Sequence, residues 1–286
     1  MEFIDIHVHP VLIREALELD GSLREAARSI FRIGTSPQPL ETLILEMDNA
    51  GVERAILLAL DAKTIRGFTL PSNDVVYKLL EKAPERFWAF ASVDPHDTGR
   101  AVAELERAVC DLGFLGLKLS PPIQMFKPSD ENLEPLYEKA VELEVPVLFH
   151  SGFTWLDDVS IYLAHPREFE VLALKYPELK IVLAHAGWPW VDEAMSLAMK
   201  YRNVYLDVSN VYTGTPVEHL RTLLTEEHRF RLVERFISEK IVFGSDYPRI
   251  EIDKMVEALL SLNLSYETKK KILRENAQKL IGSRKI

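Results

Sequence analysis

Eight short apolar segments recur along the chain, and a stretch with helical periodicity follows most of them. They are residues 3–10, 54–61, 87–94, 114–121, 145–152, 180–187, 203–210 and 240–248. Near-continuous runs of Val, Ile, Leu and Phe indicate strands buried on both faces, as in a parallel sheet. Eight strand–helix units in roughly 250 residues predict a (β/α)8 TIM barrel. A doubly wound open sheet is disfavoured, because it usually has fewer strands and a Gly-rich first turn, which this sequence lacks.

Two connections are longer than an ordinary strand-to-helix loop. Residues 11–38 have helical character, and we interpret them as an insertion after the first strand that covers the mouth, the C-terminal end of the barrel. Residues 150–169 form a second long connection at the same end. Loops in these places usually shape a substrate site. Since no internal repeat beyond the strand–helix unit is visible, residues 1–286 are predicted to form one barrel domain.

The first segment, FIDIHVHP, carries two histidines in an otherwise apolar strand. Residues two apart on a strand face the same side, so His7 and His9 can both point into the mouth. Neutral imidazole is a common protein ligand for Zn²⁺ and similar ions. The ends of other predicted strands supply His150, His185 and Asp246 as further candidates.

Any one of these residues could have a purely structural role. A core histidine is often satisfied by a backbone carbonyl, and Asp246 could cap the next helix. All of them, however, follow the C-terminal tips of predicted strands, where barrel enzymes carry their chemistry. The sequence therefore favours a metal site at this end of the barrel.

The motifs HVH, LFHSG, KIVLAHAG, FGSDYP and ENAQKLIG occur in this order and together resemble the amidohydrolase superfamily. They are most similar to its amidohydrolase-related branch, which includes decarboxylases similar to aminocarboxymuconate semialdehyde decarboxylase. The resemblance extends to about residue 282 and implies one divalent ion, with Zn²⁺ expected first and Mn²⁺, Fe²⁺ or Ni²⁺ as alternatives. The implied metal ligands are His7, His9, His150 and Asp246.

The resemblance gives two further residues a place at the metal. In one-metal members, the histidine matched by His185 lies near the metal-bound water or the substrate, and in two-metal members it binds the second ion. Lys118 matches a fourth-strand lysine that is carboxylated and bridges two ions in two-metal relatives. Because this branch typically has one metal, we expect Lys118 to be unmodified, either binding substrate or packing near the mouth.

Several residues that follow the strand ends could contact a substrate. The aromatic ones are Phe153, Trp155, Trp188, Trp190 and Tyr247. They either line a pocket for a planar substrate or simply cover the mouth with apolar surface. Arg249 could pair with a substrate carboxylate or lie solvated beside a helix cap. The candidate substrate residues are Lys118, Trp155, Trp188, Tyr247 and Arg249.

The predicted site has the equipment of a metal-dependent hydrolase. A divalent ion with an open position lowers the pKa of bound water toward about 7. Asp246 could accept the proton from that water, and His185 could polarise a carbonyl or orient the water. We therefore expect hydrolysis of an amide, lactone or ester of a small organic acid. The alternatives are non-oxidative decarboxylation of an aromatic or unsaturated acid, and a non-catalytic barrel that only binds metal.

Composition and the remaining reactive residues narrow the partners. With 34 basic and 44 acidic residues the net charge is −10, which disfavours nucleic acid and anionic membranes. Without a basic leader or an apolar run of about 20 residues, a cytoplasmic protein is expected, and a homodimer is compatible with the sequence. The single cysteine, Cys110, is expected to be a small buried thiol. Surface or capping roles are expected for His96, His165, His219 and His228.

Overall fold

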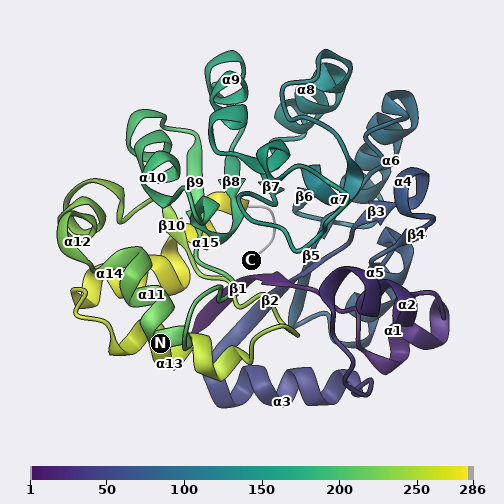
Figure 1. Cartoon of the computed structure of the whole chain (residues 1–286). Helices are drawn as coiled ribbons and strands as arrows, with labels where there is room; N and C mark the ends of the chain where they lie inside the picture. The colour runs from purple at the N-terminus through teal and green to yellow at the C-terminus, as the bar shows by residue number, and fades with distance from the viewer. Residues whose placement is uncertain (1, 283–286) are drawn as a thin grey trace.

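Eight parallel strands curl into a barrel in the computed structural model, which describes residues 2–282 (Figure 1). In spatial order they are β1 (Phe3–Val8), β2 (Val52–Leu58), β5 (Phe87–Ala91), β6 (Gly116–Leu119), β7 (Val147–Phe149), β8 (Ile181–Leu183), β9 (Val204–Asp207) and β10 (Ile241–Val242). The ring closes where Ile6 N donates to Phe243 O at 3.0 Å and Asp246 N donates to His7 O at 2.9 Å. The predicted TIM barrel is confirmed.

Helices form the outer layer around these strands (Figure 1). They are α3 (Leu40–Ala50), α5 (Asn73–Lys82), α6 (Thr98–Cys110), α8 (Glu134–Glu142), α9 (Arg167–Lys175), α10 (Val191–Lys200), α11 (Pro216–Leu224), α12 (Glu227–Leu232), α13 (Ile252–Ser261), α14 (Tyr266–Lys270) and α15 (Asn276–Ile281). Their periodic apolar residues pack against the outer faces of the strands in the main core. Inside the barrel, Ile6, Leu58 and Phe90 pack in a second cluster that the α15 residues Leu280 and Ile281 join. No helix among the described residues is long and apolar enough to cross a bilayer.

The strands are shorter than the apolar segments that predicted them. The last residues of several segments leave the sheet and turn, and His185 (φ 58°) and Asp246 (φ 66°) have left-handed backbone conformations. Left-handed backbone breaks the strand repeat, so these side chains are aimed by the turn rather than by the sheet. The pairing of β1 with β2 also shifts register between Asp5 and Val8, an irregularity that re-aims side chains beside active sites.

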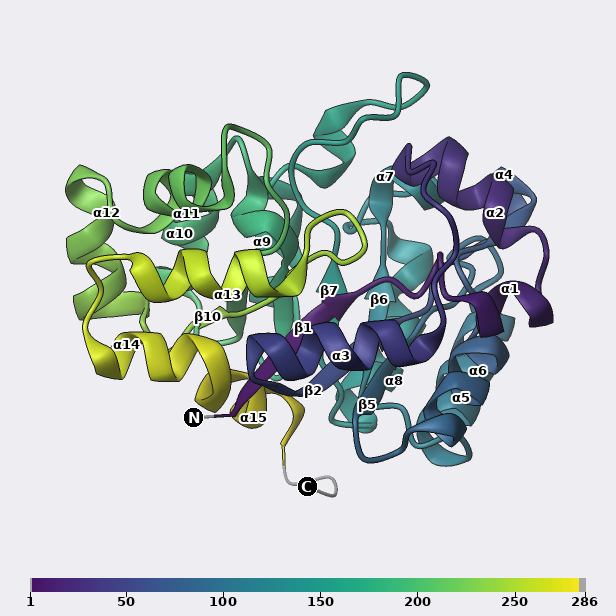
Figure 2. The same ribbon diagram turned by 90° about the horizontal axis from the view of Figure 1, so that it is seen from below.

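Both long connections lie at the mouth, as predicted. The first contains α1 (Arg14–Leu19), α2 (Leu23–Ala26) and the π-helix η1 (Ala27–Phe31), and Figure 2 shows α2 at the end of the barrel opposite α15. The second contains η3 (Ile161–Ala164). Arg32 Nη2 donates to Trp155 O at 2.8 Å, so the two connections are joined directly. The insertion therefore covers part of the mouth.

Short elements complete the chain. They are the hairpin β3 (Asp61–Ala62) and β4 (Phe68–Thr69), the helices α4 (Lys63–Arg66) and α7 (Pro121–Gln124), the 3₁₀ helices η2 (Glu131–Leu133) and η4 (Ala184–Gly187), and the π-helices η5 (Val233–Ile237) and η6 (Lys271–Glu275). The hairpin was not predicted, because strands of two residues leave no periodic pattern. Arg66 pairs with Asp158 and so ties α4 to the second long connection.

Candidate metal centre

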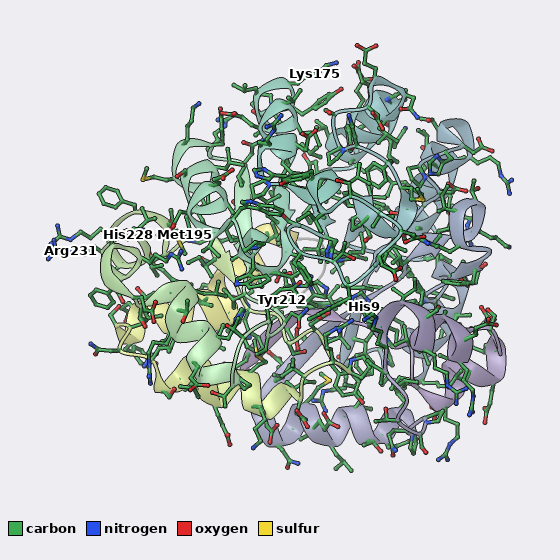
Figure 3. All side chains as sticks on the ribbon, in the orientation of Figure 1. His9, Lys175, Met195, Tyr212, His228 and Arg231 are labelled. Atoms are coloured by element: carbon green, nitrogen blue, oxygen red, sulfur yellow. The ribbon has the colours of Figure 1, made fainter. Side chains whose placement is uncertain are left out.

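The polar residues predicted at the strand ends meet at the mouth. They are His7 in β1, His9 just after it, His150 after β7, His185 after β8 and Asp246 after β10. The ring centroid of His7 lies 5.0 Å from that of His9 and 5.2 Å from that of His185. The ring centroids of His150 and His185 are 4.9 Å apart. Figure 3 shows His9 and Tyr212 in the middle of the ring of strands. The predicted convergence is confirmed.

Three ligand atoms form a triangle at the centre of this group. His7 Nε2 is 3.1 Å from His9 Nε2, and Asp246 Oδ1 is 3.5 Å from each of these nitrogens. Two donor atoms that each lie about 2.1 Å from a shared ion, at usual coordination angles, are separated by about 3.0–3.5 Å. The triangle therefore has the spacing of three ligands of one divalent ion.

Asp207, at the end of β9, holds His7 from behind. Its Oδ2 accepts a hydrogen bond from His7 Nδ1 at 2.7 Å. Its Oδ1 accepts from the backbone nitrogens of His185 (3.0 Å) and Ser209 (2.8 Å), and from the Ser209 hydroxyl. Because a carboxylate only accepts, the proton of His7 is on Nδ1 and the lone pair of Nε2 faces the triangle. This is the usual arrangement of a carboxylate that orients a metal-binding histidine.

His150 and His185 face each other across the same space. His150 Nε2 donates to Phe153 O at 3.1 Å, and His185 Nδ1 donates to Ser209 O at 3.2 Å, so each ring has its lone pair on the other nitrogen. These two atoms, His150 Nδ1 and His185 Nε2, are 3.2 Å apart. Two acceptors at that distance repel unless a cation or a proton lies beside them.

The donor set fits a divalent cation. The hydrogen bonds at the backs of three imidazoles leave His7 Nε2, His150 Nδ1 and His185 Nε2 unprotonated and facing inward. In the described structure the Lys118 ammonium, 3.4 Å from His7 Nε2, is the donor that reaches this set. Imidazole nitrogens with a carboxylate are the ligands that Zn²⁺ and similar ions prefer. The site can therefore hold a divalent metal ion, and the two groups among the described residues whose ligand atoms lie close enough are His7, His9 and Asp246, and His7, His185 and Asp207.

Burial tunes the charges of these residues. It lowers the pKa of His7, His9 and His185 well below the ordinary value, with neighbouring cations and imidazoles adding to the effect. Burial also lowers the pKa of His150 to about 3. Neutral imidazoles keep the lone pairs that a metal needs, so the site is prepared for metal at neutral pH.

Burial also shifts the pKa values of the carboxyl groups and of the lysine at the site. Burial raises the pKa of Asp246 to about 7, against the lowering effects of Arg249 and Lys118. It lowers the pKa of Lys118, which is only 2% exposed, to about 8. Asp5 lies two residues before His7 in β1, and burial raises its pKa to about 7. Its Oδ1 accepts hydrogen bonds from the backbone nitrogens of His7 and Ser245. Such perturbed groups are typical of functional sites.

A cavity opens next to the triangle. Its polar lining includes His9, Lys118, His150, His185, Asp246 and Arg249, and its apolar lining includes Ile30 and Phe31 of the insertion. Of the five candidate substrate residues, Lys118, Trp155 and Arg249 line this cavity. Trp188 instead stacks on the cavity residue Tyr212, with centroids 4.6 Å apart and planes 10° apart. Tyr247 lines a separate groove with Arg249.

Sequence comparison places the chain in a family. Residues 4–282 match the family described as Amidohydrolase. The chain belongs to the amidohydrolase family. Four gamma-resorcylate decarboxylases are 25–28% identical to it, and the matches cover 84% of this chain and 83–86% of each relative. One of them, from Polaromonas sp. (strain JS666), is 28% identical over 283 residues.

Solved structures show the same fold. An uncharacterised TIM-barrel protein from Bordetella bronchiseptica has a TM-score of 0.78 at 23% identity and 99% coverage of both chains. A dihydroxybenzoic acid decarboxylase from Polaromonas sp., solved with bound manganese and the inhibitor 2-nitroresorcinol, has a TM-score of 0.68 at 22% identity. That match covers 100% of this chain and 98% of the decarboxylase.

The chain is an enzyme of the amidohydrolase superfamily, but the expected hydrolase activity is wrong. The relatives that it matches along most of their length are decarboxylases, which break a carbon–carbon bond, and not hydrolases. The residue pattern could not distinguish the two reactions, because the same metal ligands and acid–base groups serve both. The similarity to decarboxylases along most of the chain is the observation that argues against hydrolysis.

The residues outside the site include three surprises. Cys110 is exposed, not buried, because it lies on the face of α6 opposite the buried residues of that helix. His219 is only 1% exposed, since it lies one turn before the buried Leu223 on the inner face of α11. His165 is also buried, but it has the predicted capping role, because its Nδ1 accepts from Arg167 N at the start of α9.

Sequence analysis missed the residues that support the ligands. Asp207, Ser209 and Tyr212 follow or end the seventh strand, in NVYLDVSN and just beyond it. A carboxylate at the tip of an apolar strand is the same signal that identified Asp246, so Asp207 could have been found. Ser209 and Tyr212 carry no such signal, because their roles depend on partners brought together by the fold.

Proposed function

We propose that this enzyme is a metal-dependent decarboxylase that releases CO₂ from a small aromatic carboxylic acid. The observation that carries the proposal is the set of inward-facing imidazole lone pairs and Asp246 beside a cavity lined by aromatic side chains and two cations. The whole-length similarity to gamma-resorcylate decarboxylases supports the reaction class. The inhibitor-bound decarboxylase with the same fold supports an aromatic ligand.

The proposed metal ligands are His7, His9 and Asp246, with His150 as the fourth ligand that the family resemblance implies. The triangle distances of 3.1–3.5 Å support the first three. Zn²⁺ remains the expected ion from the ligand types, and Mn²⁺ is its main competitor, since a structurally similar decarboxylase contains manganese. When bound, the ion would hold the substrate carboxylate or a neighbouring oxygen and draw electron density from it.

The cavity would orient an aromatic acid by charge and by ring contacts. Lys118 and Arg249 line it and can attract a carboxylate. Phe153 packs edge-on against Trp155 (4.9 Å, 85°) and against Tyr212 (5.8 Å, 81°), which forms one aromatic wall. Such a wall favours a flat ring and excludes water from it. We assign Trp188 to the support of Tyr212, and Tyr247 to the outer rim.

Decarboxylation of an aromatic acid needs a proton at the ring carbon that bears the carboxylate. Among the described residues that line the cavity, Asp246 is the only carboxyl group, and we assign it this proton. A C–H bond forms at that carbon, the bond to the carboxylate breaks, and its electron pair returns to the ring as CO₂ leaves. Asp246 then regains a proton from water. His185, whose Nδ1 donates to Ser209 O, can accept a hydrogen bond from a hydroxyl group of the substrate through Nε2.

The experiment uses protein loaded with Mn²⁺ or Zn²⁺ and a panel of hydroxybenzoic acids labelled with ¹³C in the carboxyl group. We expect labelled CO₂ and one deuterium per product ring when the reaction is run in D₂O. Asp246→Asn should lose both signals, because an amide has no proton of suitable acidity to give. Absence of CO₂ from every acid in the panel with metal-loaded protein would overturn the proposal.

A further inference from the structure

One buried hydroxyl at the cavity has no partner. Ser120, directly after β6, is 1% exposed, and its Oγ makes no hydrogen bond among the described residues. The same side chain lines the cavity beside the metal triangle. Buried polar atoms are nearly always hydrogen-bonded, and an unmade bond costs stability. An exception that borders a ligand cavity indicates a group whose partner is the ligand.

The local sequence removes one of the usual hydrogen-bond partners of this hydroxyl. Ser120 is the N-cap of α7, a position where a serine side chain normally accepts a hydrogen bond from the backbone of the first turn. Here the next two residues are Pro121 and Pro122, which have no N–H to donate, so only the Ile123 N–H remains of the usual capping donors. No capping bond is formed, and the hydroxyl is left free.

The backbone of Ser120 is nevertheless held firmly. Its N–H donates to Gln124 Oε1 at 2.8 Å, and its carbonyl accepts from Gln124 N at 2.9 Å. The Gln124 amide nitrogen donates in turn to Asp61 O at 2.6 Å and Val93 O at 2.8 Å. A side chain fixed in this way is preorganised for binding, because little freedom is lost when a ligand arrives.

The neighbours of Ser120 indicate what it would bind. Lys118, in β6, precedes it by two residues, and the backbone of Ser120 is still extended just beyond that strand. Residues two apart on extended backbone face the same side, and both residues line the cavity. We infer that Ser120 is a specificity residue that hydrogen-bonds a hydroxyl group on the ring of the aromatic acid, while Lys118 and the metal attract its carboxylate. The inference rests on the proposed function for the identity of the ring acid.

The test compares benzoate with 2-hydroxy-, 3-hydroxy- and 2,6-dihydroxybenzoate on Mn²⁺-loaded protein by calorimetric titration. Wild-type protein should bind at least one hydroxylated acid about tenfold or more tightly than benzoate, the scale of one buried hydrogen bond. Ser120→Ala should lose that preference while its affinity for benzoate stays the same. Thr154→Val is the matched control, because the Thr154 hydroxyl lines the same cavity but already accepts from Leu156 N. It should keep the preference.

A purely structural serine would behave differently. Since Ser120 Oγ has no partner, Ser120→Ala in the ligand-free protein should melt at the same temperature as wild type or higher. A lower melting temperature with an unchanged preference for the hydroxylated acids would overturn the inference. If CO₂ is released but Ser120→Ala discriminates as wild type does, the inference fails and the proposed function stands. If no acid loses CO₂ but the binding preference depends on Ser120, the inference stands and the proposed function fails.

Discussion

Replacing Asp207 with asparagine tests whether the protonation of His7 is set by its hydrogen bond. Oδ1 of Asp207 accepts from His185 N, Ser209 N and the Ser209 hydroxyl, whereas Oδ2 accepts only from His7 Nδ1. In Asp207→Asn the amide oxygen should occupy the position of Oδ1, where three donors point at it. The amide NH₂ then faces His7, whose Nδ1 must become an acceptor. The ring proton moves to Nε2, and the lone pair that the metal needs is lost.

The expected loss follows from that change. Substitution of a residue that orients a metal-binding histidine usually lowers metal affinity or activity 10–100-fold. This range corresponds to about 1.4–2.7 kcal/mol of metal-binding free energy. The fold should survive, because three of the four hydrogen bonds to residue 207 keep an acceptor. The loss should therefore appear in metal affinity far more than in unfolding free energy.

The assay is a competition titration of metal-free protein with a coloured chelator, and ¹⁵N NMR of the histidine rings reports the position of the proton. Asp192→Asn is the control, because Asp192 is a surface carboxylate that pairs with Arg229. It should bind metal as wild type does. If Asp207→Asn holds metal as tightly as wild type, or if its His7 keeps the proton on Nδ1, the reasoning about the hydrogen bond is wrong.

Three further outcomes are expected. Metal at a hundred times its dissociation constant should raise the unfolding free energy by about 2.7 kcal/mol, and a chelator should remove that gain; equal melting with and without metal would contradict a native site. Gly152→Ala should lower the free energy of unfolding in urea by about 2–5 kcal/mol, because Gly152 has φ +88° and a Cβ there would lie 2.1 Å from Trp188 O. The control Gly21→Ala should change little, because nothing lies within 4 Å of a Cβ at that position. Burial lowers the pKa of His219 to about 4, whereas in the unfolded chain a histidine has its ordinary pKa of about 6.5. Between these pH values the unfolded chain binds a proton that the folded protein does not. The free energy of unfolding should therefore fall by up to about 3 kcal/mol as pH falls from about 6.5 to 4. His219→Leu should flatten that part of the stability profile.

The sequence was sufficient to predict the barrel and the convergence of its polar strand ends. Both follow from short-range rules: apolar runs mark buried strands, and a polar residue at the tip of such a run must lie at the mouth. His150 and Asp246 were found in this way. The same rules do not predict the residues that hold the ligands in place. The partner of His7 is Asp207, which is 200 residues away in the sequence, and no local pattern links the two.

The failures among the outer residues have similar causes. His219 could have been predicted as buried from its spacing to Leu223, but its charged neighbours suggested a surface role. The exposure of Cys110 could also have been predicted, because the helical repeat places it opposite Leu105 and Ala108, which lie on the buried face of α6. Decarboxylation was named only as an alternative to hydrolysis, because the ligands and proton carriers that the sequence shows can serve both reactions.

Buried polar atoms without hydrogen bonds reduce the stability of the fold, and some of them lie around the metal triangle. Asp5 Oδ2, His9 Nδ1 and Ser120 Oγ are all buried without a hydrogen bond among the described residues. Asp5 lies in β1, His9 directly after it, and Ser120 directly after β6. The apolar clusters inside and outside the barrel can offset this loss, although other buried polar atoms, such as Tyr176 Oη and His219 Nε2, also lack a hydrogen bond in the described structure. Cations and hydroxyl-bearing ligands can supply partners for the buried polar atoms around the mouth. Each bond formed in this way adds to the affinity for the ligand. The residues that contribute least to folding are therefore the ones that a search for function should change first.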